Sequence, residues 1–172
     1  MPHGGIELRV PHADQERINE LAKAMRAEFR GAQLRKDLIA DLRLAVAPGV
    51  SAVKEKLRAW PHDGVSVADP ALTPYLANRV RTQVRLTGEK TGIRIRIPKT
   101  PSIRGFNRAA SSLNSARGWR HPVFGKDRWV QQISPLPGYF DDTLNEGKPL
   151  YRAAVLRALA KMERRILARV RV

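Results

Sequence analysis

Side chains that commonly carry out catalysis are few in this sequence and lie far apart. The chain has no Cys, which excludes thiol nucleophiles, disulfides and Cys-based zinc sites and suits a reducing compartment. It contains neither a His-Glu-x-x-His pattern nor a Gly-x-Ser-x-Gly nucleophile turn. His121 and Asp127 could act as a base and its orienting group, but no nucleophile or oxyanion site accompanies them. The other histidines, His3, His12 and His62, are isolated. We therefore expect no catalytic residues and no cofactor.

Two further patterns could serve ligand binding, and each has a simpler structural explanation. Residues 88–91, Gly-Glu-Lys-Thr, share letters with a phosphate-binding loop but lack the Gly-x4-Gly-Lys-Thr spacing. Asp141, Asp142 and Glu146 could hold a cation. Acidic residues are also expected wherever a helix begins, because they offset its positive end and cap its free amides. We therefore expect helix capping here and no metal site.

The strongest chemical signal is positive charge. Lys and Arg number 32 against 16 Asp and Glu, which gives a formal net charge of +16. Such an excess favours an acidic partner, either nucleic acid or an acidic protein surface. The basic residues are nevertheless spread along the whole chain, and an Arg-rich, Ala-rich composition also results from a GC-rich coding genome. Charge alone leaves both interpretations open.

The clearest strand pattern concentrates arginines on one face of a hairpin. Apolar or β-branched residues alternate with arginines over residues 79–86, and Ile93, Ile95 and Ile97 alternate with Arg94 and Arg96. The intervening residues 87–92 supply two glycines for a hairpin loop. The predicted basic face consists of Arg79, Arg81, Arg85, Arg94 and Arg96. Because like charges opposite each other destabilise a sheet, partner carboxylates, DNA phosphates or solvent and salt must offset them.

A second candidate surface is the aromatic segment 117–140. It holds five of the ten aromatic residues of the chain (Trp 3, Tyr 3, Phe 4), together with three Gly and three Pro. Aromatic anchors contribute disproportionately to interface energy, so this composition predicts assembly. The predicted protein interface comprises Trp119, Arg120, His121, Phe124, Trp129, Tyr139 and Phe140. Packing in the core is the alternative for Trp119 and Trp129, because large aromatic residues on strands are usually half buried or more.

The remaining patterns predict the elements that must position these surfaces. A short strand is expected within residues 6–10, and apolar residues at helical spacing predict a long helical tract from Asp14 to Trp60. Gly31 indicates a kink, and Pro48 a bend or break. We expect strands around Trp119 and Trp129 and a terminal helix over 149–171. A coiled coil with a partner would need more sustained heptads.

These elements predict one α+β domain over residues 1–172, with a small antiparallel sheet packed by the bent N-terminal helical tract and the C-terminal helix. Its parts are a strand and helices in 1–62, the hairpin 79–97, the aromatic region 117–140 and the helix 149–171. The sequence has no apolar run of about 18 residues and no export signal at its start. We therefore expect a soluble, unexported protein that does not bind membranes.

The central tract resembles a known family. Residues 113–125, LNSARGWRHPVFG, are followed by DRWV at 127–130 and PGYF at 137–140. This tract is similar to that of phage neck or tail-completion proteins, the minor tail proteins similar to gene product ten of a lambda-like siphophage. The Arg-His-Pro-Val-Phe-Gly string and the later Pro-Gly-Tyr-Phe look like versions from phages of actinobacteria. The order of strand, helix, hairpin and final helix also follows the family, whereas residues 98–107 depart from it by their proline content.

The resemblance implies a structural protein of the virion, present in several copies around the DNA channel where a head joins its tail. Its implied partners are further copies of itself in a ring, the head connector with its adaptor or stopper, and the tail terminator or tail tube. Non-specific contact with channel DNA is a further implication, and assembly would take place in the host cytoplasm. The family offers no catalytic residues to carry over. A stand-alone basic nucleic-acid-binding protein is the alternative, and an unrecognised enzyme is a third class.

Overall fold

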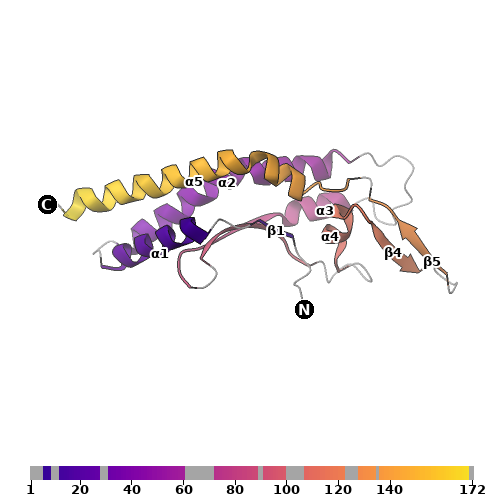
Figure 1. Cartoon of the computed structure of the whole chain (residues 1–172), viewed down its shortest axis with the longest axis horizontal. Coiled ribbons are helices and arrows are strands. Elements are labelled where there is room, and N and C mark those ends of the chain that lie inside the picture. The colour runs from indigo at the N-terminus through magenta and orange to yellow at the C-terminus, as the bar shows by residue number, and fades with distance from the viewer. Residues whose placement is uncertain are drawn as a thin grey trace.

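The structure is a computed structural model, and it describes residues 6–8, 12–27, 31–60, 72–88, 91–99, 107–122, 128–134 and 136–170. Long helices cover one face of a three-stranded sheet, and a separate two-stranded hairpin extends from the end of the molecule opposite the C-terminus (Figure 1). This arrangement confirms the predicted α+β class with helices packed on a small antiparallel sheet.

The first two helices form a pair of neighbours instead of one kinked tract. Helix α1 spans His12–Ala27 and α2 spans Gly31–Arg58. A Cβ atom at Gly31 would lie 1.8 Å from the Met25 carbonyl oxygen, so only glycine allows the chain to pass so close to the end of α1. The apolar faces of both helices, including Ile18 and Leu38, are buried in one core. The prediction of a mere kink at Gly31 is therefore wrong.

Helix α2 continues through Pro48, which lies inside it and is exposed. Of the two expected outcomes, a bend or a break, the break is therefore wrong, and the bend stays a prediction. Proline can occupy a helix interior where its ring faces solvent, although it leaves the carbonyl four residues earlier without its usual amide donor. The buried face of α2, with Leu42, Val46 and Val53 on it, passes the proline without interruption.

Helix α5 spans Asp141–Val170 and lies alongside α2 (Figure 1). It begins eight residues before the predicted start at 149, so Pro149 lies inside it. Val155, Leu159, Met162 and Ile166 recur at helical spacing along α5 and are all buried. Of the helices in the described ranges, none combines the length and the apolar character that a membrane span requires.

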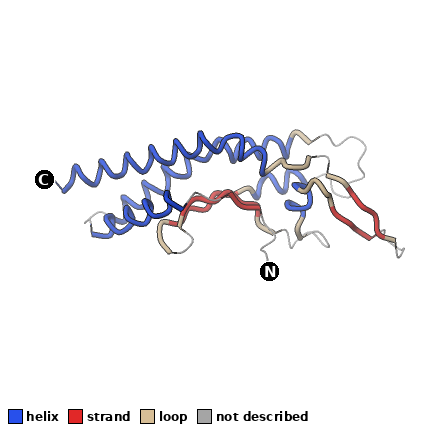
Figure 2. Tube along the Cα trace, in the orientation of Figure 1, coloured by secondary structure: helices blue, strands red, loops and turns tan. Residues whose placement is uncertain are grey.

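The three-stranded sheet has the order β1-β3-β2, with all pairs antiparallel. Strand β1 spans Ile6–Leu8, β2 spans Arg81–Arg85 and β3 spans Gly92–Ile97, which confirms the predicted hairpin. Ile93, Ile95 and Ile97 are buried against the helices. The strands lie beneath the helical layer (Figure 2), so the opposite face of the sheet points away from the core.

Two short helices complete the fold, one before the three-stranded sheet's β2 and one before the second hairpin. Helix α3 spans Leu72–Arg79, and α4 spans Ala109–Asn114. Strand β4 spans Trp119–Pro122 and pairs antiparallel with β5, Trp129–Gln132. The two predicted aromatic strands are therefore confirmed, and the turn expected between them falls outside the described residues.

Candidate interaction surfaces

The β4–β5 hairpin presents to solvent a face that carries two large apolar side chains among polar ones. Trp129, Gln131 and Ile133 alternate along the chain and are all exposed, with 56% of Trp129 and 70% of Ile133 accessible. Trp119 is half-buried and packs against the core. Because successive side chains of a strand point to opposite sides, the hairpin has an inner face toward the core and an outer face toward solvent. We call Trp129, Gln131 and Ile133, together with Arg120 opposite Gln131, the outer hairpin face.

Contacts at the base of the hairpin fix its orientation. The buried Ser134 hydroxyl donates to the Leu113 carbonyl and accepts from the Leu136 amide at 3.2 Å. Gly118, with φ +66°, enters β4 so close to the opposite strand that a Cβ would lie 1.8 Å from the Gln132 carbonyl oxygen. The hairpin is therefore held at its base by α4, while its outer face remains uncovered by the described residues.

Two of the predicted interface residues belong to the core. Tyr139 and Phe140 are 2% and 0% exposed, so the prediction that they form a docking surface is wrong. The Tyr139 hydroxyl donates to the Ala110 carbonyl at 3.3 Å. Burial, with a smaller contribution from Asp141, raises the pKa of Tyr139 above its usual range. The two rings contact each other edge to face and anchor the start of α5.

Asn114 joins the hairpin side of the molecule to α5. Its side-chain oxygen accepts from the amides of Phe140 at 2.9 Å and Asp141 at 3.4 Å, and its amide nitrogen donates to the Asp141 carboxylate at 2.6 Å. Its carbonyl also accepts from the Gly138 amide at 2.9 Å. Free amides at a helix start need such acceptors, and sequence reasoning looked for them only within residues 141–143. A residue 26 positions earlier supplies them.

The remaining residues of the predicted interface have mixed outcomes. Arg120 is exposed on β4. His121 stands opposite Val130 in the strand register, but its side chain is outside the described part of the chain, as is the whole of Phe124. Ile133 was missed, although its spacing of four from Trp129 on one strand could have identified it.

The sheet carries a second surface, which we call the arginine face. It consists of Arg81, Gln83 and Arg85 on β2 and Arg94 and Arg96 on β3. Arg96 stands between Arg81 of β2 and Glu7 of β1 in the strand register, and Gln83 stands opposite Arg94. Arg81, Arg85 and Arg96 are exposed, and Arg94 is half-buried.

Arg79 does not belong to the arginine face, which corrects the prediction. It is the last residue of α3, where its guanidinium donates to the Tyr75 hydroxyl at 2.9 Å and to the Lys99 carbonyl at 3.4 Å. It also lies 5.1 Å from the centre of the Tyr75 ring, a cation–π distance. The apparent strand alternation at residue 79 therefore belongs to a helix end.

Acidic residues on the long helices pair with basic ones inside the molecule. Arg17 on α1 holds both carboxylate oxygens of Glu163 on α5 at 2.6 Å. The buried Asp14 pairs with Arg152 at 3.2 Å. Two further pairs join α2 to α5, Asp41 with Lys161 at 2.9 Å and Asp37 with Arg165 at 2.8 Å. These pairs fix how the three helices sit together.

The pKa values of two carboxyl groups reflect this pairing. The hydrogen bond from Arg17 lowers the pKa of Glu163. Hydrogen bonds from Arg165 and then Gln33 lower the pKa of Asp37. In both cases the ionised form is stabilised in the folded state, because its partner is cationic or donates to it.

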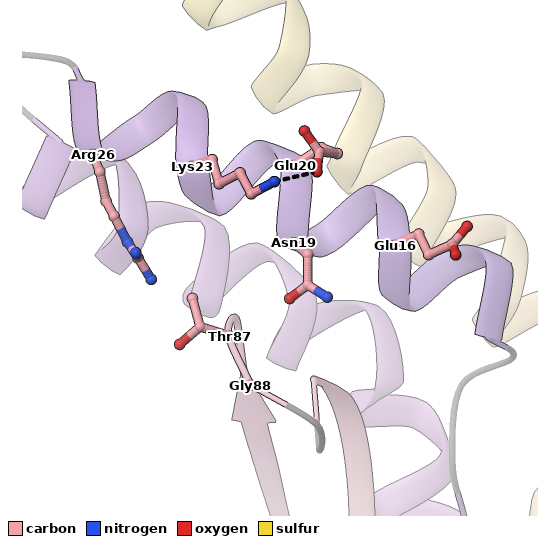
Figure 3. A pocket seen from close by; sticks show the side chains of 7 residues that line it. All are labelled: Glu16, Asn19, Glu20, Lys23, Arg26, Thr87 and Gly88. Atoms are coloured by element: carbon pink, nitrogen blue, oxygen red, sulfur yellow. Dashed lines mark hydrogen bonds and ion pairs between the residues drawn. The ribbon is translucent and has the colours of Figure 1, made fainter.

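An open groove of about 530 Å³ lies between α1 and the loop after β2 (Figure 3). Its lining carries both charge signs, including Glu16, Glu20, Lys23 and Arg26, and Lys23 pairs with Glu20 at 2.9 Å. Thr91 fixes the loop by donating to the Asn19 side chain at 2.7 Å.

Within the described ranges, no group of three or more His, Asp or Glu side chains is placed to hold a metal ion. Comparison with protein-family models, curated proteins and solved structures finds no match to this chain. The two exposed surfaces, the outer hairpin face and the arginine face, are therefore the features on which function must be argued.

Proposed function

We propose that this protein is a structural component of a phage head-to-tail neck, assembling in several copies around the DNA channel to join the head connector to the tail. The observation that carries the proposal is the outer hairpin face, which exposes Trp129 and Ile133 at one end of an elongated molecule. The resemblance of residues 113–140 to phage neck and tail-completion proteins supplies the biological setting.

An isolated two-stranded hairpin is at best marginally stable in water, and it gains stability when a face is covered. Here the inner side of the hairpin is held by Trp119 and by the contacts of Ser134, whereas the outer side exposes a large aromatic and a β-branched residue. Tryptophan at the centre of an interface is among the residues that contribute most to binding. The outer hairpin face therefore suits contact with a neighbouring subunit.

A ring of identical subunits is built from head-to-tail contacts, so each subunit contributes two different surfaces. The outer hairpin face is suited to be one of them, because it projects from the body and can reach a neighbouring copy. The net charge of +16 opposes close approach of copies through basic surfaces. A contact centred on the apolar side chains of Trp129 and Ile133 is therefore the favourable kind.

The test is the solution mass of the nuclease-treated protein, measured by light scattering at low and high salt. We expect a multimer at both salt concentrations, because an apolar contact is not screened by ions. The double variant Trp129→Ala with Ile133→Ser should be a monomer that still unfolds in one cooperative thermal transition.

The matched control is Leu44→Ser on α2, which removes an apolar side chain that is 72% exposed elsewhere on the surface. It should assemble like the wild type. A multimer that persists in the hairpin variant, or one that is lost equally in the control, would contradict assembly through this face.

A further inference from the structure

The outer hairpin face needs a complementary surface elsewhere on the same chain, because a head-to-tail contact joins two different surfaces. The open groove of about 530 Å³ between α1 and the loop after β2 lies toward the end of the molecule that holds the C-terminus, and the hairpin projects from the opposite end (Figure 1). Two copies can therefore meet end to end, with the hairpin of one at the groove of the next. The groove is then the second surface of the proposed assembly contact, and its role rests on that proposal.

The groove has room for a large side chain. Pockets of roughly 300–1,000 Å³ hold drug-sized molecules, so about 530 Å³ accommodates an indole ring. One wall is α1, from which Asn19 and Arg26 extend toward the loop (Figure 3). The other wall is Thr87 with Gly88, where a Cβ atom would meet no described atom within 4 Å beyond its chain neighbours. The loop wall therefore borders space that an incoming side chain can fill.

The lining carries carboxylates that suit the cation of the outer hairpin face. Glu16 and Glu20 are exposed on adjacent turns of α1, in a protein of net charge +16, and Arg120 is exposed on the hairpin. Lys23 already pairs with Glu20, but their side chains are 71% and 70% exposed, so water screens this pair. The Glu20 carboxylate can therefore accept a second cation from a neighbouring copy.

The spacing of the groups on the two surfaces also agrees. Arg26 is exposed on α1, and a guanidinium group binds the face of an indole ring more strongly than that of other aromatic rings. From Trp129, Gln131 lies about 6.6 Å along β5 and Arg120 about 4.8 Å across the register, so Arg120 and Trp129 are about 8 Å apart. Glu20 and Arg26 both line the groove, about 9 Å apart along the axis of α1. The two pairs of groups can therefore meet together.

We propose that the groove between α1 and the loop after β2 binds the outer hairpin face of a neighbouring copy. In this contact the Trp129 ring lies over the Arg26 guanidinium, and Arg120 pairs with the Glu20 carboxylate. Ile133 packs against the methylene stems of the lining side chains. A two-fold contact between two outer hairpin faces is less favourable, because it brings together the Arg120 side chains of both copies.

The experiment mixes two variants, each of which lacks one of the two surfaces, and measures their solution mass by light scattering. The hairpin variant carries Trp129→Ala with Ile133→Ser and keeps the groove. The groove variant carries Glu20→Arg with Arg26→Ala, both at exposed positions, and keeps the hairpin face. A 1:1 mixture should form a dimer with one copy of each variant, because one intact hairpin face then meets one intact groove. Such a dimer also shows that both variants are folded.

Alone, the groove variant should self-associate at least about 30-fold more weakly than the wild type, as expected for the loss of a residue that dominates an interface. Its matched control carries Glu55→Arg with Arg43→Ala, which replace the same residue types at exposed positions of α2 and change the net charge equally. This control should assemble like the wild type.

Reversing the charges tests the pair of Arg120 with Glu20 separately. Arg120→Glu and Glu20→Arg should each weaken assembly when introduced alone. The chain that carries both substitutions should assemble again, because each contact then joins opposite charges once more. A doubly substituted chain that assembles no better than the single variants would overturn this pairing.

Two results would overturn the role of the groove and leave the neck proposal standing. One is a groove variant that assembles like the wild type while the hairpin variant is monomeric. The other is a pair of monomeric variants that form no dimer on mixing. A wild type that is monomeric at low and high salt would instead contradict the proposed assembly itself, and the groove contact with it.

Discussion

At the residue scale, exposure separates two groups of aromatic side chains that look equivalent in the sequence. Trp129 is on the surface, whereas Tyr139 and Phe140 lie in the core. Composition could identify residues 117–140 as rich in aromatic side chains. It could not tell which of these side chains are buried by other parts of the chain. That outcome depends on Asn114 and Ala110, which meet residues 138–141 only after folding. No local pattern encodes such a distant contact.

The bidentate pair of Arg17 with Glu163 leads to a pH prediction. Its hydrogen bond lowers the folded-state pKa of Glu163 below the unfolded value of about 4.3, so the pair stabilises the fold fully above that pH. The stabilisation is lost as pH falls through the lower folded-state pKa. Glu163→Gln should therefore lower the free energy of unfolding by about 1 kcal/mol near pH 7, a value that allows for solvent screening, since about a third of the side chain is exposed.

Urea denaturation near pH 7 and below about pH 3 measures this difference. It should be smaller in acid than near pH 7. Glu20→Gln is the control, because its pair with Lys23 spans one turn of an exposed helix surface and should matter less. If Glu163→Gln lowers the free energy of unfolding equally at both pH values, packing and not charge explains the effect.

At the element scale, periodicity predicted which residues face the core more reliably than where elements begin and end. The alternation in 80–97 gave the β2–β3 hairpin, and helical spacing gave the buried faces of α2 and α5. The errors arose at Gly31, Pro48 and Pro149. Local rules treat glycine and proline as breaks, whereas tertiary packing and solvent exposure decide whether the helix stops, turns back or continues.

Pro48 provides a prediction at this scale. It lies in the interior of α2 with its side chain exposed, and it deprives the Leu44 carbonyl of an amide donor. Pro48→Ala should raise the free energy of unfolding by about 1–3 kcal/mol, since alanine restores the donor and has higher helix propensity. Pro74→Ala in the first turn of α3, where the amide has no helical partner, should change it by less than about 0.5 kcal/mol. Chemical denaturation measures both changes. If Pro48→Ala raises the free energy of unfolding no more than Pro74→Ala does, α2 needs its proline.

At the scale of the whole molecule, the fold separates its two exposed surfaces. The outer hairpin face projects from one end, and the arginine face covers the side of the sheet that points away from the helices (Figures 1 and 2). Internal ion pairs between α1, α2 and α5 hold the body that carries both. Because the two surfaces lie on different parts of the molecule, they can contact two different partners at the same time.

The measurement that tests the neck proposal most directly is electron microscopy of particles assembled with and without this protein. The proposal places its gene in a tailed phage, so deleting the gene should yield DNA-filled heads and separate, complete tails that do not join. Supplying the wild-type chain should restore joined particles, and supplying the Trp129→Ala, Ile133→Ser variant should not. Normally joined, infectious particles in the absence of the chain would contradict the proposal.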